Sequence, residues 1–114
     1  MTKNQDAEFY YVPDLVEELD LSPSRIHRLL EDRALVAIRI NGVLAVPKDF
    51  IFDGRVLASL KGTVMQLSDQ GLTDDEIVAW LTGDNDYLGA RPVDELRAGK
   101  KTAVRRAAQL AEIV

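Results

Sequence analysis

Arginine side chains recur at helical spacing near the N-terminus, in the segment LSPSRIHRLLEDRALVAIRINGVLAVP (Leu21–Pro47). Arg25 and Arg28 are three residues apart, so on a helix they would occupy neighbouring positions of one face. A guanidinium donates two parallel hydrogen bonds to a phosphate or to the edge of a guanine. These residue types at this spacing therefore predict recognition of a nucleic acid.

The net charge of −5 hides an uneven distribution of charge along the chain. Residues 1–21 carry one basic and six acidic side chains, and residues 49–96 carry three basic and ten acidic ones. In contrast, residues 22–48 carry five basic and two acidic side chains, and residues 97–114 carry five and one. Two basic islands thus interrupt an acidic chain, and the acidic remainder argues against nonspecific binding of polyanions over the whole surface.

Residue types needed for catalysis or metal binding are scarce in this chain. It contains no cysteine and one histidine, His27, and it has neither a glycine-rich phosphate loop nor a nucleophile with a histidine partner. We therefore expect no enzymatic activity, no bound metal and no cofactor. No apolar run reaches about 18 residues, and the N-terminus lacks the pattern of a signal peptide, so we expect a cytoplasmic protein.

Two short helices must position the arginines. The apolar spacing of Leu15, Val16 and Leu19 predicts a first helix over residues 13–19. Ser22 and Pro23 are typical of a helix start, and they predict a second helix over residues 22–33. Its apolar residues Ile26, Leu29 and Leu30 make a buried stripe. Ser24, Arg28 and Glu31 point away from that stripe, and Arg25 and His27 flank them.

A β-hairpin follows the second helix. β-Branched residues alternate with other types from Val36, and Asn41-Gly42 is typical of a two-residue hairpin turn because both residues tolerate positive φ. The return strand ends at Pro47. Helix, turn, helix and hairpin in this order predict a winged helix-turn-helix module, in which the second helix enters the DNA major groove.

The remainder of the chain is predicted to be helical. The first signal is a helical pattern over residues 54–70, interrupted or started near Lys61-Gly62 and closed by Gly71. A capping box of Thr73 with Glu76 opens the next helix, and a short helix closed by Gly99 precedes the final one. The expected fold class is mainly α with a small β-hairpin. The expected organisation is a flexible tail (1–8), a winged helix-turn-helix (9–50) and a C-terminal helical extension packed on it (51–114).

We predict that the protein binds double-stranded DNA as a transcriptional or nucleoid-associated regulator, through helix 22–33 and wing 36–46. The predicted DNA-binding residues are Ser24, Arg25, His27, Arg28, Arg33, Arg39, Asn41, Gly42 and Lys48. A solvated polar face is the alternative for any single arginine, and the order of elements argues against it.

The second basic island has three open explanations: a charge preference of helix ends, a second phosphate contact, or a surface for a partner. Its residues are Arg97, Lys100, Lys101, Arg105 and Arg106. The alternative function is accordingly a protein-interaction module, in which the C-terminal helices bind a partner and the winged helix is structural.

The motifs E-I-x-x-W-L, ARPVD and VRRA follow the helix-turn-helix pattern in this chain. With them, the sequence resembles the small winged helix-turn-helix DNA-binding proteins of mycobacteria and related actinobacteria, over nearly all residues beyond position 9. The C-terminal part also resembles the partner-binding domain of some antitoxins. The actinobacterial resemblance implies DNA binding by the N-terminal module and control by a Ser/Thr kinase acting on the N-terminal tail, where Thr2 is the candidate phosphorylation site.

Overall fold

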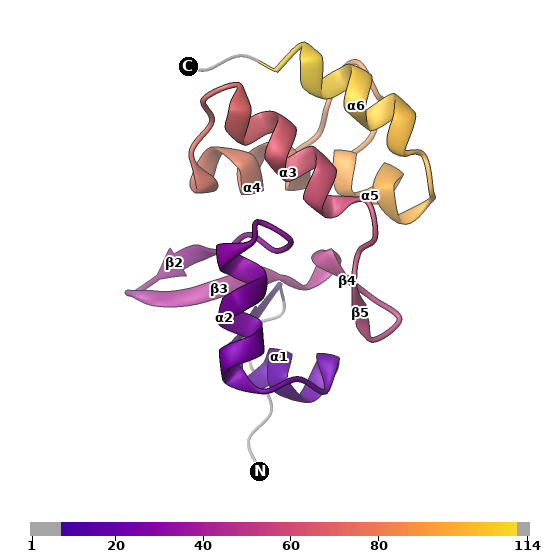
Figure 1. The fold of residues 1–114 in the computed structure, drawn as a ribbon. Helices are drawn as coiled ribbons and strands as arrows, with labels where there is room; N and C mark the ends of the chain where they lie inside the picture. Colours follow the sequence, from indigo (N-terminus) through magenta and orange to yellow (C-terminus); the bar gives the residue numbers. More distant parts are fainter. Residues whose placement is uncertain (1–7, 112–114) are drawn as a thin grey trace.

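The computed structural model describes residues 8–111, which form two lobes stacked along a longest dimension of 42 Å (Figure 1). The N-terminal lobe (residues 8–56) contains two α-helices, the strands and a short 3-10 helix, η1 (Lys48–Phe50), and the C-terminal lobe (residues 57–111) contains four α-helices. Within the described residues, no helix is long and apolar enough to cross a membrane.

The two N-terminal helices are α1 (Val12–Leu19) and α2 (Pro23–Glu31), as predicted apart from their ends. Ser22 caps α2, because its Oγ accepts a hydrogen bond from the Arg25 amide at 3.3 Å. The helix ends two residues before the predicted position. Arg33 adopts a left-handed φ of 61°, and the Ala34 amide donates back to the Leu29 carbonyl, which closes the last turn.

A three-stranded antiparallel sheet flanks these helices, in the order β1 (Phe9–Tyr11), β3 (Val43–Pro47), β2 (Ile38–Ile40). The predicted hairpin turn is confirmed, with φ of 52° at Asn41 and 81° at Gly42. The first hairpin strand begins at Ile38 rather than at residue 36, because residues 35–37 turn into the core. Strand β1 was not predicted. It pairs with β3 along its whole length and makes β3 the central strand.

Of the two predicted starts for the next helix, the one near Lys61-Gly62 is confirmed and the one at residue 54 is wrong. Residues 51–56 form a second hairpin, β4 (Ile51–Phe52) and β5 (Arg55–Val56), around the Asp53-Gly54 turn. Both turn residues have positive φ, 56° and 73°, so this pair acts as Asn41-Gly42 does in the first hairpin. The helix α3 begins only at Leu60 and ends at Asp69.

The remaining helices are α4 (Asp74–Thr82), α5 (Pro92–Arg97) and α6 (Lys101–Gln109). The predicted capping box at the start of α4 is confirmed. The Thr73 amide donates to the Glu76 carboxylate at 2.8 Å, and the Glu76 amide donates to Thr73 Oγ1 at 3.2 Å. Gly99 has a φ of 82° and separates α5 from α6, as expected for a helix-ending glycine.

Thr73→Ala is expected to lower the free energy of unfolding by about 1 kcal/mol, because it leaves the Glu76 amide without its capping acceptor. Urea denaturation followed by circular dichroism measures this change. The matched control is Thr102→Ala on the exposed face of α6, which is expected to shift stability by less than about 0.5 kcal/mol. Equal effects of the two substitutions would contradict a stabilising role for the cap.

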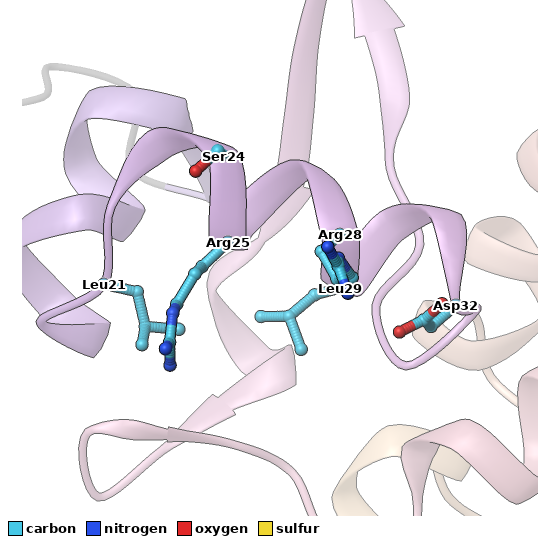
Figure 2. A pocket seen from close by; sticks show the side chains of 6 residues that line it. All are labelled: Leu21, Ser24, Arg25, Arg28, Leu29 and Asp32. Atoms are coloured by element: carbon cyan, nitrogen blue, oxygen red, sulfur yellow. The ribbon is translucent and has the colours of Figure 1, made fainter.

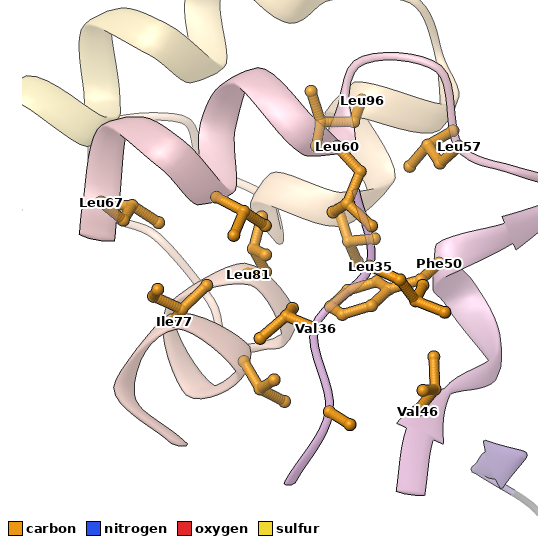
Figure 3. Close-up of a cluster of buried hydrophobic side chains, with 14 of the residues drawn as sticks. Leu35, Val36, Val46, Phe50, Leu57, Leu60, Leu67, Ile77, Leu81 and Leu96 are labelled. Carbon is orange, nitrogen blue, oxygen red and sulfur yellow. The ribbon is translucent and has the colours of Figure 1, made fainter. Parts of the chain in front are cut away.

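One hydrophobic core joins the two lobes (Figure 3). Leu35, Val36 and Phe50 from the N-terminal lobe pack against residues of α3, α4 and α5, and each is at most 1% exposed. Their buried partners in the C-terminal lobe include Leu60, Ile77, Leu81 and Leu96. The two lobes therefore share their apolar interior.

Three arginines add polar contacts between the lobes. Arg97 Nη1 donates to the carbonyl oxygens of Asp49 and Ile51, each at 2.9 Å, and its guanidinium lies 4.9 Å from the centre of the Phe52 ring. Arg91 Nη2 lies 3.0 Å from the Asp49 carboxylate, and Arg33 Nη1 lies 2.7 Å from that of Asp74. These contacts fix the orientation of the C-terminal lobe relative to α2 and the sheet.

The Arg91 guanidinium also binds Asp94 on α5, through Nε at 2.9 Å and Nη2 at 2.8 Å. The hydrogen bonds from Arg91 hold the pKa of the Asp94 carboxyl below its usual value. A lowered pKa in the folded state stabilises the protein above the unfolded pKa of the carboxyl, and this contribution is lost as the pH falls through the folded pKa.

Candidate nucleic-acid interface

The outer face of α2 is polar, exposed and slightly concave. Ser24, Arg25 and Arg28 are exposed on it. Together with neighbouring residues they line a concave region of about 580 Å³, which is completed by Leu21, Leu29 and Asp32. Figure 2 shows the side chains of Leu21, Arg25 and Leu29 on the same side of the helix, as their spacing of four residues requires.

Arg25 and Arg28 have no ionic partner among residues 8–111. The ion pairs found in that part of the chain join Arg33 to Asp74, and Arg91 to Asp49 and Asp94. The two guanidinium groups on α2 therefore keep their hydrogen-bond donors for a ligand. An unpaired, exposed guanidinium pair on an amphipathic helix is suited to phosphate oxygens and to base edges.

The β2–β3 hairpin, or wing, carries the next group of predicted residues. Asn41 and Gly42 form its exposed tip, and Val43 beside them is 51% exposed. Arg39 Nη1 donates to the Gly42 carbonyl oxygen at 2.9 Å, so this arginine braces the turn while its remaining donors face outward at the surface. The wing thus presents a rigid tip with one cation at its base.

Three predicted residues lie away from the concave face of α2. His27 lines a smaller groove of about 160 Å³ with Arg33 and Asp74, on another flank of the helix. Arg33 is occupied by its ion pair with Asp74. Lys48 follows β3 at the end opposite the wing tip, with its Nζ 5.1 Å from the centre of the Tyr10 ring. DNA contacts by His27, Arg33 and Lys48 stay predictions.

In the structure, the residues of the second basic island form two separate groups. Arg97 belongs to the contact between the lobes, whereas Lys100, Lys101, Arg105 and Arg106 are exposed at the start and along the outer side of α6. We call these four residues the α6 basic face. The candidate phosphorylation site Thr2 lies outside the described residues.

The sequence analysis missed three residues that line the concave face, Leu21, Leu29 and Asp32. The spacing of Arg25 and Leu29 carries a signal for Leu29, because residues four apart lie on one stripe of a helix, whereas Leu21 lies in the turn before α2 and Asp32 is its C-cap. Leu29 was assigned to the buried side, and it is half-buried, so it serves both the core and the rim of this surface.

Comparison with known proteins places this arrangement in a family. A model of the winged helix-turn-helix domain of DNA-binding protein Rv2175c matches residues 4–51, and a model of the Rv2175c C-terminal domain of unknown function matches residues 57–111. The chain belongs to the Rv2175c family. DNA-binding protein Rv2175c of Mycobacterium tuberculosis is 34% identical over an alignment 117 residues long, and the alignment covers 91% of this chain and 80% of that protein.

The fold is also that of the Rv2175c family. The NMR structure of Rv2175c superimposes with a TM-score of 0.81 at 32% identity, covering 98% of this chain and 86% of that one. The predicted fold class, mainly α with a winged helix-turn-helix and a helical extension, is confirmed, as is the resemblance to small actinobacterial winged-helix proteins. The Rv2175c family is one of DNA-binding proteins, in agreement with the prediction that the chain is not an enzyme.

Proposed function

We propose that this protein binds double-stranded DNA through the outer face of α2 and the wing, and that it acts as a transcriptional or nucleoid-associated regulator. The observation that carries the proposal is the pair Arg25 and Arg28 on the exposed face of the second helix, which has no ionic partner within residues 8–111. Membership of the Rv2175c family supports it.

In the proposed complex, α2 lies in the major groove and α1 braces it from behind. Ser24 and Arg25 are in the first turn of α2, from which side chains of a recognition helix reach base edges. Arg28 is one turn further on and contacts a base or a phosphate. The wing tip at Asn41 and Gly42 approaches the neighbouring backbone or minor groove, while Arg39 holds its shape.

The charge distribution restricts how DNA can approach. The segments before and after the helix-turn-helix and wing are acidic, with net charges of −5 over residues 1–21 and −7 over residues 49–96. Phosphates are repelled by those segments and attracted by residues 22–48, which carry a net charge of +3. Electrostatics thus favours a docking orientation in which the outer face of α2 meets the duplex.

A Ser/Thr kinase is a further proposed partner, on the strength of the family resemblance stated for the sequence. A phosphate on Thr2 would add negative charge to an N-terminal segment that is already acidic, and it would oppose the approach of DNA.

The DNA-binding proposal is tested by fluorescence anisotropy of a labelled duplex at two salt concentrations. Arg25→Gln/Arg28→Gln is expected to weaken binding about thirtyfold or more, since two good arginine–base pairs contribute about 1–3 kcal/mol each. Affinity of the wild-type protein is expected to fall steeply with salt, because phosphate contacts release counterions. The melting temperature should stay nearly unchanged, since both side chains are exposed.

The matched control is Arg55→Gln/Lys61→Gln, which removes the same two charges from exposed positions on other elements. Its affinity is expected to remain within about twofold of the wild-type value, because its only effect is a change in net charge. An unchanged affinity of the Arg25→Gln/Arg28→Gln protein would exclude α2 as the recognition helix.

A further inference from the structure

We propose that the α6 basic face is a second phosphate-binding surface, which contacts the same duplex as α2 and lengthens the bound site. This inference rests on the proposed function. It gives the C-terminal lobe a role in DNA binding, with the sugar-phosphate backbone as its ligand.

The cations of the α6 basic face have no acidic partner in the part of the chain that the structure describes. Among residues 8–111, no carboxylate lies within ion-pair distance of Lys100, Lys101, Arg105 or Arg106. In a chain whose net charge is −5, four neighbouring cations without acidic partners form a local positive field. Such a field attracts a polyanion to this end of the molecule.

The helix dipole does not account for these cations. Lys100 is the N-cap of α6 without a capping side-chain hydrogen bond, Lys101 is its first residue, and the first turn contains no acid. Positive charge is unfavourable at a helix N-terminus, where unpaired amide groups already carry partial positive charge. The two lysines are therefore repelled by the positive N-terminal end of α6. A phosphate group bound beside them would reduce this repulsion.

Helix α6 is held rigidly on α3. Gln66 Nε2 donates to the carbonyl oxygen of Arg105 at 3.1 Å, and Gln70 Nε2 donates to that of Ala108 at 2.9 Å. The Arg105 guanidinium lies over Gly62, where a Cβ would be 2.8 Å from its Nη2. Glycine at this position of α3 makes room for the arginine, so the α6 basic face has a fixed geometry.

The composition of this surface fits a phosphate backbone better than a protein partner. The apolar residues Val104, Ala107 and Ala108 are buried against the lobe, and the exposed side of α6 carries lysine, arginine, threonine and glutamine. Protein interfaces are depleted in lysine and enriched in aromatic side chains at their centre. Lysine and arginine on an exposed helix are typical of contacts to phosphates.

The position of α6 determines how long a duplex must be to contact both α2 and the α6 basic face. It lies at the end of the molecule opposite α1 (Figure 1), and the longest dimension is 42 Å. At about 3.4 Å per base pair, a duplex of about 12 base pairs spans that dimension. A duplex shorter than that span cannot lie along the whole molecule, so it is expected to make fewer contacts with the α6 basic face while α2 holds it.

The test compares a 24-base-pair duplex with a 10-base-pair duplex closed by a hairpin, both titrated by fluorescence anisotropy at several salt concentrations. Lys100→Gln/Lys101→Gln/Arg106→Gln is expected to weaken binding of the long duplex about tenfold or more, and to lower its salt slope by about 2–3. Binding of the short duplex is expected to change less than about twofold, since only α2 and the wing contact it. Arg105 is left intact because of its packing on Gly62.

The matched control, Lys100→Arg/Lys101→Arg/Arg106→Lys, keeps the charge and is expected to bind both duplexes like the wild-type protein. A triple glutamine variant that binds both duplexes normally would overturn this inference alone, provided that Arg25→Gln/Arg28→Gln still weakens both. No binding of either duplex by the wild-type protein would overturn the proposed function as well. Loss of self-association in sedimentation, with DNA affinity unchanged, would assign the α6 basic face to the acidic surface of a second copy instead.

Discussion

Phe50→Ala is expected to lower the free energy of unfolding by about 3–5 kcal/mol, the largest loss for any single substitution considered. Phe50 is fully buried and packs where the N-terminal lobe meets α3, α4 and α5. Its removal deletes the largest fully buried side chain and leaves a cavity shared by both lobes. Because the core is continuous, the loss is expected to destabilise both lobes together.

Urea denaturation measures this effect with two probes, far-ultraviolet circular dichroism for all helices and Trp80 fluorescence for the C-terminal lobe. The two transitions are expected to coincide and to shift together in the variant. Tyr87→Ala serves as the aromatic control, since Tyr87 is 58% exposed, and it is expected to change stability by less than about 0.5 kcal/mol. A Trp80 transition unaffected by the loss of Phe50 would mean that the lobes unfold independently.

Arg97→Met is expected to cost about 2 kcal/mol, because it removes the charged donor from two carbonyl oxygens and retains most of the aliphatic stem. The carbonyl groups of Asp49 and Ile51 both accept from Arg97 Nη1 at 2.9 Å, in a half-buried position between the lobes. The variant also loses the cation from the face of the Phe52 ring, a contact that adds a smaller contribution.

Thermal and urea denaturation measure the loss of stability in Arg97→Met, with Arg106→Met as the matched control. Arg106 is exposed on α6 and carries the same charge, so its substitution is expected to change stability by less than about 0.5 kcal/mol. If the two variants were equally stable, the hydrogen bonds of Arg97 would add nothing to stability, and the contact between the lobes would depend on apolar packing and on the ion pairs of Arg33 and Arg91.

The elements that could be predicted from sequence are those fixed by neighbouring residues. Ser22 caps α2 through the amide three residues on, and the capping box of Thr73 with Glu76 spans the same distance. The Asn41-Gly42 turn needs only two residues that adopt positive φ. Local hydrogen bonds and dihedral preferences were sufficient to place the helix-turn-helix, the wing and the start of α4.

The elements that could not be predicted depend on distant parts of the chain. Strand β1 has three residues, too few for a periodic pattern, and it exists because Tyr10 pairs opposite Val46. The second hairpin has only two residues in each strand, although its Asp53-Gly54 turn carries a recognisable signal. Helical periodicity over the surrounding residues therefore leaves two possible helix starts, residue 54 and Lys61-Gly62, and only the second agrees with α3.

The candidate site also combines features that neighbouring residues fix with features that depend on distant parts of the chain. Helical periodicity correctly places Ser24, Arg25 and Arg28 on the exposed side of α2. The partners of Arg33 and Arg97 could not be predicted, because Asp74 is 41 residues from the first and the Asp49 carbonyl is 48 residues from the second. A cation count along the sequence treats all arginines alike, whereas tertiary contacts decide which of them remain open to a ligand.

The shared core has a consequence for how tightly a duplex is held. With the lobes joined by one interior, α6 cannot move independently of α2, so the distance between the two surfaces is set before DNA arrives. Once α2 has bound, the contact at α6 forms as an intramolecular step at a high effective concentration, without a second loss of translational freedom. The overall affinity for DNA then exceeds the affinity of either surface alone. A rigid core keeps the effective concentration of the second surface high, so its rigidity determines the size of this increase in affinity.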